Sequence, residues 1–241
     1  MQETLSSVLP LLAALAGYLI GSLSFAVIVS RAMGLSDPRS YGSGNPGATN
    51  VLRSGNKAAA VLTLALDALK GYAPTLAVFI WGPRWGLGEG TAALVGLAAF
   101  VGHLWPVFFR FEGGKGVATA AGVIFALNPL LGAATLATWM IVAFFSRYAS
   151  LASIVAAAFA PVYQLLIWEA GPAALVLIVM GLLLVWRHQA NLKKLLAGTE
   201  SKLGQRANAA AAAPPTGTSK KHPHGTGPKA AGHSHPHPRK K

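Results

Sequence analysis

Long apolar segments run through most of this chain, and they constrain its fold more than any other feature. Seven can be separated, at 8–29, 58–80, 91–109, 117–128, 130–145, 150–167 and 172–186. Runs of about 20 apolar residues with few charges are candidates for membrane-spanning helices. Only 11% of the residues are charged, against roughly 25% in a typical soluble domain. The sequence therefore predicts an all-α integral membrane protein with seven transmembrane helices.

The fourth apolar segment is short, and Asn128-Pro129 separates it from the fifth. A single helix over 117–145 would be about 43 Å long, which exceeds the roughly 30 Å hydrocarbon core of a bilayer. The residue before a proline is also biased away from helical geometry. We therefore expect two helices in this region.

The distribution of basic residues predicts the orientation in the membrane. With seven spans, one side carries a single basic residue, Arg84, together with Glu3, Glu89 and Glu169. The other side shares the basic C-terminal tail and carries Arg31, Arg39, Arg53, Lys57, Arg110, Lys115, Arg147, Arg187, Lys193 and Lys194. By the positive-inside rule the basic side is cytoplasmic. We therefore expect the N-terminus outside and the C-terminus in the cytoplasm, whereas six spans would place the basic tail outside.

The composition divides the chain into a membrane domain over 1–203 and a tail over 204–241. The tail is rich in Ala, Pro, Gly, Ser, Thr and His, so it is predicted to be disordered. We expect the tail to contact anionic lipid headgroups rather than to bind a metal ion weakly through its histidines. Nucleic acid is not an expected partner. The chain has no cysteine, which excludes disulfides and a cysteine acyl-enzyme. The N-terminus has no basic region before its apolar run, which argues against a cleaved signal peptide.

Four polar segments fall on the predicted cytoplasmic side, at 36–57, 112–119, 146–148 and 187–200. The first contains G-S-G-N-P-G-A-T-N at 42–50, which is too rich in glycine and proline for a regular helix or strand. Such a turn is either a plain connector or a cradle in which backbone N–H groups bind phosphate.

The second segment contains G-G-K-G at 113–116, directly before a helix. It lacks the spacing of a Walker A loop. A glycine-rich turn at a helix N-terminus nevertheless directs N–H groups and partial positive charge at one point, and Lys115 adds a full charge. The alternative is a tightly packed loop with a lysine at the membrane boundary.

The remaining polar residues have ordinary structural explanations when each is taken alone. Ser146 and Arg147 are typical of a cytoplasmic anchor, and His188 and Asn191 share one helical face. Asp67 and Lys70 lie within the second span at a spacing of three, which favours a structural ion pair. Together, however, the four segments gather cations and short polar side chains on one face. No metal or other cofactor is expected, because acidic and histidine side chains do not cluster. Such a surface suits an anionic substrate with more than one phosphate, and its place between membrane helices suggests a lipidic second substrate.

Three of the quoted stretches closely resemble the motifs of the bacterial acyl-phosphate:glycerol-3-phosphate acyltransferases, the PlsY family. They are G-S-G-N-P-G-A-T-N-V-L-R, G-G-K-G-V-A-T and H-x-x-N-L-x-x-L-x-x-G-T-E. The similarity covers roughly residues 10–203. It implies an enzyme of the bacterial inner membrane that moves an acyl group from acyl phosphate to the 1-hydroxyl of glycerol 3-phosphate, giving lysophosphatidic acid and phosphate. Membrane lipids and the two substrates are the implied partners, and the oligomeric state is left open.

Site residues follow from the same resemblance, position by position. Glu200 is expected to be structural. The H-x-x-x-x-D box of other glycerolipid acyltransferases is absent, since neither His103 nor His188 has an aspartate five residues on. The implied catalytic residues are Ser43, Arg53, Lys115, His188 and Asn191, and the implied substrate-binding residues are Gly44, Asn45, Gly47, Gly113, Gly114, Gly116, Ser146 and Arg147.

Two proton acceptors stay open for such a reaction, the donor's own phosphate and His188. A different class of function also remains, a transporter or binding protein for a phosphorylated solute. The absence of a visible internal repeat argues against an alternating-access transporter.

Overall fold

The computed structural model describes residues 2–203, and all regular secondary structure in this part of the chain is helical, without strands. The predicted all-α class is therefore confirmed for the described residues. The predicted tail over 204–241 lies outside them. The helices in chain order are α1 (Gln2–Gly21), α2 (Phe25–Ala32), α3 (Ala48–Leu52), α4 (Lys57–Trp81), α5 (Glu89–Leu104), α6 (Val117–Leu127), α7 (Pro129–Ser146), α8 (Ala149–Ile167), α9 (Pro172–Arg187) and α10 (Gln189–Leu196).

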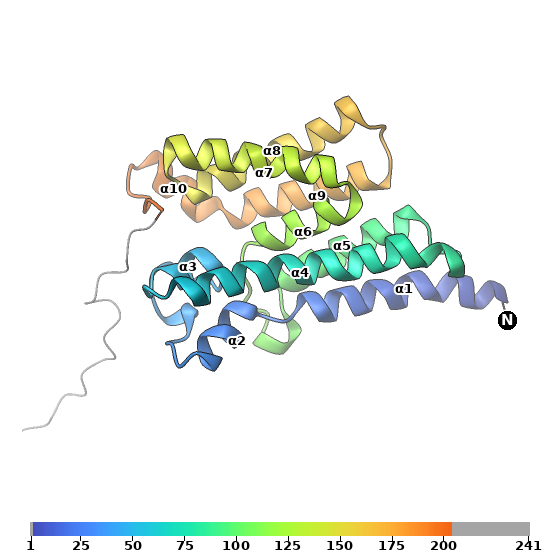
Figure 1. Cartoon of the computed structure of the whole chain (residues 1–241), viewed down its shortest axis with the longest axis horizontal. Helices are drawn as coiled ribbons and strands as arrows, with labels where there is room; N and C mark the ends of the chain where they lie inside the picture. The colour runs from blue at the N-terminus through green and yellow to red at the C-terminus, as the bar shows by residue number, and fades with distance from the viewer. Residues whose placement is uncertain (1, 204–241) are drawn as a thin grey trace, which may run out of the picture.

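The long helices lie side by side in one bundle (Figure 1). Helices α1, α4 and α5 form one side and α7, α8 and α9 the other, with the short α6 between them. Helices α2, α3 and α10 gather at the end of the bundle that lies opposite the N-terminus. Segments that are far apart in the sequence are thus brought together at this one end.

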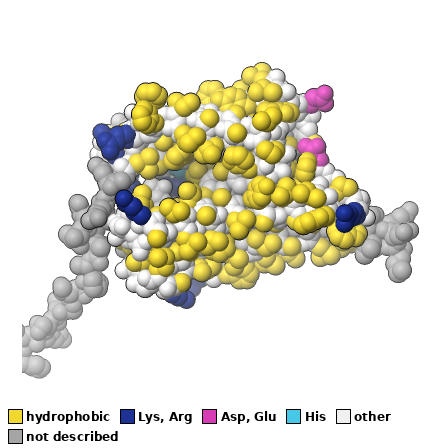
Figure 2. All heavy atoms as spheres, in the orientation of Figure 1, with side chains coloured by type: hydrophobic (Ala, Val, Ile, Leu, Met, Phe, Trp, Pro, Cys, Tyr) yellow, Lys and Arg dark blue, Asp and Glu magenta, His cyan; other side chains and the backbone are white. Residues whose placement is uncertain are grey.

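The face of the bundle seen in Figure 2 is largely apolar, as a bilayer requires. Leu11, Val61, Phe144 and Leu166 are examples of large apolar side chains that are more than half exposed. By length and composition, four described helices can cross a membrane, or six if each of two bent pairs counts as one crossing. The expected fourth span, α6, has 11 residues and extends only about 16 Å. Seven full-length spans are therefore not confirmed.

The expected first span over 8–29 is broken in the structure. Helix α1 ends at Gly21 and α2 begins at Phe25, with a bend of 40° between them. The ammonium of Lys70 on α4 donates a 2.7 Å hydrogen bond to the Leu23 carbonyl within this break. Lys70 also pairs with Asp67 at 2.8 Å, so the predicted ion pair is confirmed. The pair satisfies a backbone group that the broken helix leaves without an intrahelical partner.

Asn128 ends α6 and begins α7, which confirms the two separate helices expected there. Its side-chain oxygen accepts hydrogen bonds from the N–H groups of Leu130 and Leu131, both at 3.1 Å. Pro129 takes the first helical position, where a missing N–H costs nothing. A capping asparagine followed by proline is a helix-start signal that can be read directly from sequence.

Glycines allow α4 and α6 to approach closely enough to hold the centre of the bundle together. A Cβ atom at Gly122 would lie 2.0 Å from the Ala68 carbonyl oxygen, and one at Gly71 would lie 2.3 Å from that of Thr119. Small residues serve the same purpose in many membrane bundles, because backbone contact replaces the missing hydrophobic driving force. Helix α6 is thereby fixed against α4, with its N-terminus directed at the end of the bundle where α3 and α10 lie.

Candidate active site

A cavity of about 630 Å³ lies between α4, α6, α7, α8 and α9. One part of its wall is apolar and is formed by side chains such as Leu64, Leu136, Ala156 and Leu177. The other part is polar and lies at the end of the bundle where α3 and α10 are found. Polar side chains from distant parts of the sequence meet there: Ser43, Asn45, Arg53, Lys115, Ser150, His188, Asn191 and Glu200.

Asn50 organises the loop that carries the first motif, a role that the sequence reasoning missed. Its side-chain nitrogen donates to the carbonyls of Pro38 and Tyr41, at 2.6 and 3.1 Å. Its side-chain oxygen accepts from the Ser43 N–H at 2.9 Å and from the Arg53 guanidinium at 3.4 Å. The buried amide therefore holds Ser43 and Arg53 against the same point, and both line the cavity.

The glycine-rich turn over 113–116 packs tightly against the end of α5. The N–H of Gly114 donates to the His103 carbonyl at 3.1 Å, so this N–H group is not directed at a ligand. A Cβ atom at Gly113 would lie 2.2 Å from that same carbonyl oxygen. Gly116 has a φ of +82°, which favours glycine, and it caps α6. The turn therefore serves to place the side chain of Lys115 in the cavity.

Lys115 links the second motif to the third. Its ammonium donates a hydrogen bond to the side-chain oxygen of Asn191. The amide nitrogen of Asn191 donates to Glu200 at 2.7 Å, and the same carboxylate oxygen accepts from the Ser150 hydroxyl at 2.7 Å. Burial lowers the pKa of Lys115 to about 8; the Glu200 carboxylate opposes this shift, and Arg53 is among the cations that add to it. An excess of positive charge in a partly buried site suits an anion.

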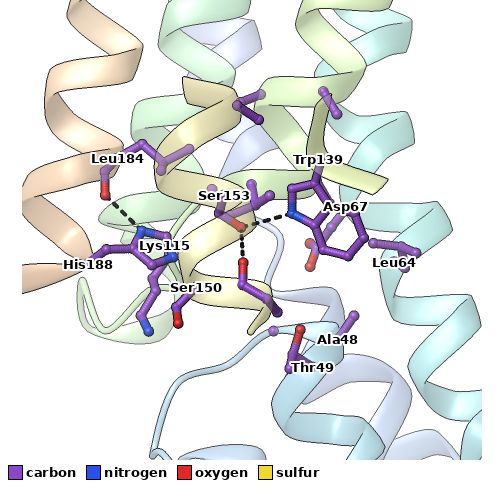
Figure 3. Close-up of a pocket in the computed structure, with 18 of the residues that line it drawn as sticks. Ala48, Thr49, Leu64, Asp67, Lys115, Trp139, Ser150, Ser153, Leu184 and His188 are labelled. Carbon is purple, nitrogen blue, oxygen red and sulfur yellow. Dashed lines mark hydrogen bonds between the residues drawn. The ribbon is translucent and has the colours of Figure 1, made fainter. Parts of the chain in front are cut away.

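His188 is 3% exposed and lines the cavity. Its Nδ1 atom lies 2.8 Å from the Leu184 carbonyl oxygen, which can only accept (Figure 3). Nδ1 therefore carries the hydrogen, and Nε2 of the neutral ring has a lone pair available as an acceptor. This tautomer is the one that a general base at Nε2 would need.

The structure brings most of the predicted site residues to this one cavity, but not all of them. Ser43, Asn45, Gly47, Arg53, Lys115, Gly116, His188 and Asn191 line it, whereas Gly44, Gly113, Gly114, Ser146 and Arg147 do not. The Ser146 hydroxyl donates to the Val142 carbonyl at 2.6 Å. The carbonyl of Arg147 accepts from the Leu203 N–H at 2.8 Å, which places Arg147 beside a residue of the cavity wall.

Two serines of α8 line the cavity although the sequence reasoning did not select them. The Ser153 hydroxyl accepts a 3.1 Å hydrogen bond from the Trp139 indole and donates to the Ala149 carbonyl (Figure 3). Ser150 is held by Glu200. Their stretch, S-L-A-S at 150–153, has the composition of an ordinary helix start, so the sequence carries little signal for them. Residues 2–203 hold no group of three or more acidic or histidine side chains placed to bind a metal ion.

Known proteins match this chain over most of its length. A family model described as glycerol-3-phosphate acyltransferase matches residues 11–198. A glycerol-3-phosphate acyltransferase of Paraburkholderia phytofirmans is 61% identical over 209 residues, covering 87% of this chain and 98% of that protein. One of Burkholderia vietnamiensis is 62% identical over 203 residues, with coverages of 83% and 94%.

Two crystal structures are also similar, both of PlsY, an integral membrane glycerol 3-phosphate acyltransferase. The glycerol 3-phosphate form has a TM-score of 0.75 and 38% identity, and covers 81% of this chain and 96% of that one. The lysophosphatidic acid form has a TM-score of 0.73 and 37% identity, with coverages of 80% and 94%.

Proposed function

The chain belongs to the glycerol-3-phosphate acyltransferase family of the PlsY type, and from this premise we propose that its acyl donor is an acyl phosphate. As a member of that family it acylates glycerol 3-phosphate to lysophosphatidic acid in a membrane. In the proposed reaction the 1-hydroxyl oxygen of glycerol 3-phosphate attacks the acyl carbonyl carbon. The bond between that carbon and the phosphate oxygen breaks, and inorganic phosphate leaves.

One observation carries the proposal: a single cavity joins a cationic end to an apolar wall. Arg53 and Lys115 stand at the cationic end, and the apolar wall includes Leu64, Leu136 and Leu177. An acyl phosphate has this same division, with an anionic head on an apolar chain. The cationic end must also hold the phosphate of the acceptor, and two neighbouring phosphates require more than one cation.

The proposed catalytic set is Ser43, Arg53, Lys115, His188 and Asn191. Arg53 and Lys115 neutralise the two phosphates, and Lys115 stabilises the charge that grows on the leaving phosphate. Asn191 orients the Lys115 ammonium through their hydrogen bond. Ser43 is exposed at the cavity edge, where its hydroxyl donates to a phosphate oxygen.

The chemistry requires little beyond positioning. An acyl phosphate is a mixed anhydride with a good leaving group, so no covalent intermediate with the enzyme is needed. Holding two anions together with one hydroxyl oriented toward the carbonyl supplies the larger part of the rate enhancement. The leaving phosphate accepts the hydroxyl proton, and His188 is the alternative acceptor because its Nε2 lone pair is available.

The other predicted binding residues take supporting roles in this proposal. Gly47 lets the backbone come close to the phosphates at the cavity wall, beside the amide of Asn45. Gly116 lines the wall as well, and its missing side chain lets the turn pack against Phe100. Gly44, Gly113 and Gly114 do not line the cavity, and they set the backbone path of the two turns. Arg147 is exposed beside the cavity wall and draws anions toward it. Ser146 holds the end of α7 through its bond to Val142.

We further propose that the cationic end faces the cytoplasm of a bacterial inner membrane, with seven apolar segments and the N-terminus outside. Support comes from the charges at the two ends of the bundle. On the face seen in Figure 2, Lys and Arg side chains lie mainly at the end formed by α2, α3 and α10, and the acidic side chains in view lie at the other; Glu200 lies at the cationic end. This asymmetry agrees with the positive-inside rule.

The test is an assay of the purified protein in detergent or liposomes with glycerol 3-phosphate and one donor at a time. Acyl phosphate, acyl-coenzyme A and acyl carrier protein thioester are compared at equal chain length. We expect lysophosphatidic acid and inorganic phosphate in equal amounts from acyl phosphate alone. Product formation from a thioester at a comparable rate would refute the proposed donor.

A further inference from the structure

Arg187, the last residue of α9, donates hydrogen bonds to the backbone of the glycine-rich turn over 113–116. Its Nε donates to the Gly114 carbonyl at 3.1 Å, and its Nη2 donates to the carbonyls of Gly113 and Gly114 at 2.8 and 3.0 Å. Both glycines are buried, and they immediately precede Lys115. One guanidinium thus holds the two peptide groups that carry Lys115 into the cavity.

The turn is also held by His103 of α5. The His103 carbonyl accepts from the Gly114 N–H at 3.1 Å. A Cβ atom at Gly114 would lie 2.2 Å from His103 Nε2. The Pro46 carbonyl oxygen is also close, at 2.9 Å from the same Cβ position. The turn is therefore tightly packed at Gly114, and Arg187 holds the two carbonyls that the His103 contacts leave unbonded.

Arg187 does not line the cavity, whereas Lys115 and its neighbours Gly116 and His188 do. We propose that Arg187 is a positioning residue, which clamps the glycine-rich turn so that the Lys115 ammonium meets the phosphate of the substrate. This inference rests on the proposed role of Lys115, but it does not depend on which acyl donor is used.

The geometry of the clamp explains why arginine is needed. Guanidinium presents several N–H donors in a fixed plane, so one side chain can bond two carbonyl oxygens at once. An ammonium at the same position is a point charge and cannot reproduce this arrangement. The simpler explanation of Arg187 is a cationic anchor at the membrane boundary. An anchor, however, would be served equally well by lysine.

A double-mutant cycle separates the clamp from the anchor. We expect Arg187→Ala to lower kcat/KM by about 10-fold or more, because a displaced Lys115 loses its charge-assisted contact. In a Lys115→Ala background the same change should cost no more than about 2-fold, since residues that act through one another are not additive. Arg187→Lys should recover only part of the loss. The exposed Arg110→Ala is the matched control, expected to stay within about 2-fold of the wild type in both backgrounds.

Chemical rescue gives a second readout that a purely structural role would not produce. Guanidinium ion at millimolar concentration should raise the activity of Arg187→Ala and leave that of Arg187→Ala, Lys115→Ala unchanged. All rates are normalised to the amount of protein that unfolds cooperatively, and Arg187→Gln replaces Arg187→Ala if the latter does not fold. The assays use whichever acyl donor the wild type accepts, so a wrong donor assignment leaves the test intact.

Two results would overturn the proposal. The first is an equal fold-loss from Arg187→Ala with and without Lys115, which would mean that the two residues act independently. The second is full activity in Arg187→Lys, which would mean that charge at the boundary is sufficient.

Discussion

The ammonium of Lys115 and the side-chain oxygen of Asn191 are hydrogen-bonded although 76 positions separate them in sequence. The bond joins the turn before α6 to α10, and Glu200 extends it to Ser150 on α8. Two motifs that are distant in sequence therefore form one polar site.

Lys115→Ala should lower kcat/KM by about 10–150-fold, because a charge-assisted hydrogen bond to phosphate contributes roughly 1.5–3 kcal/mol. Lys115→Arg should recover only part of this loss, since a planar guanidinium places its charge differently from an ammonium. The measurement is steady-state kinetics normalised to folded enzyme. If Lys115 were a membrane anchor alone, alanine would reduce the yield of protein in the membrane while kcat/KM stayed near normal.

The pH dependence of kcat/KM should show an alkaline limb with a pKa of about 8, set by Lys115 in the free enzyme. Below that pH the ammonium is charged and neutralises phosphate; above it the neutral amine cannot. A bound phosphate dianion favours the charged form, so the matching limb in kcat should lie at higher pH.

Lys115→Arg provides the control for this limb, because arginine stays protonated throughout the accessible range. Its residual kcat/KM should no longer fall near pH 8. An unchanged alkaline limb in this variant would assign the titration to another group. The profiles are recorded at constant ionic strength, since screening alters contacts between charges.

Gly122→Ala should destabilise the bundle, because the added Cβ would lie 2.0 Å from the Ala68 carbonyl oxygen, a backbone atom that cannot turn aside. Overpacking of this kind costs about 1–3 kcal/mol, which corresponds to roughly 2–4 °C in Tm per kcal/mol for a chain of this size. Gly90→Ala is the matched control, since its Cβ would lie 3.6 Å from Pro172. Thermal unfolding in detergent that treats the two variants alike would contradict the close packing of α4 and α6.

Single cysteines can map the proposed orientation, because the chain has none of its own. Probes at Ser54, Glu112, Tyr148 and Lys193 should be shielded from a thiol reagent that cannot cross the membrane. A probe at Gly88, which has open space around it, should be labelled from outside intact cells. Labelling at Tyr148 would place the connection between α7 and α8 outside and would contradict the seven-span arrangement.

Hydropathy was enough to locate the long helices, because each segment that crosses lipid must itself be apolar, but it did not separate α2 from α1 or find α3 and α10. The Asp67–Lys70 pair and the Asn128 cap were also readable, since both depend on residues close together in the chain. The break between α1 and α2 was not. Ser22 and Ser24 fit an apolar run, and the lysine that satisfies the break lies 47 residues away.

The candidate site likewise contains residues that the sequence identifies and residues that it does not. Ser43, Arg53, Lys115, His188 and Asn191 were selected by motif, and all five line one cavity. Two residues that arrange them were missed: Arg187 acts on glycines 73 and 74 positions away, and Asn50 acts within a loop that follows no regular pattern. Asn50 looks like an ordinary turn residue, and Arg187 looks like a boundary cation. Ser146 was selected and Ser150 was not, yet only Ser150 lines the cavity; the two serines lie on different helices, because α7 ends at Ser146 and α8 begins at Ala149.

The lysine contact at the helix break has a consequence for biosynthesis. The Leu23 carbonyl is satisfied by Lys70, which is synthesised 47 residues later. In lipid, an unsatisfied backbone carbonyl costs several kcal/mol. While α4 is still in the ribosome, α1 and α2 therefore have a lower free energy as an unbroken helix, or with the break still in water, than in the bent form in lipid. We therefore expect the bent form to become the favoured one only once α4 lies beside α1 and α2, so that the N-terminal third of the chain reaches its final structure as a unit.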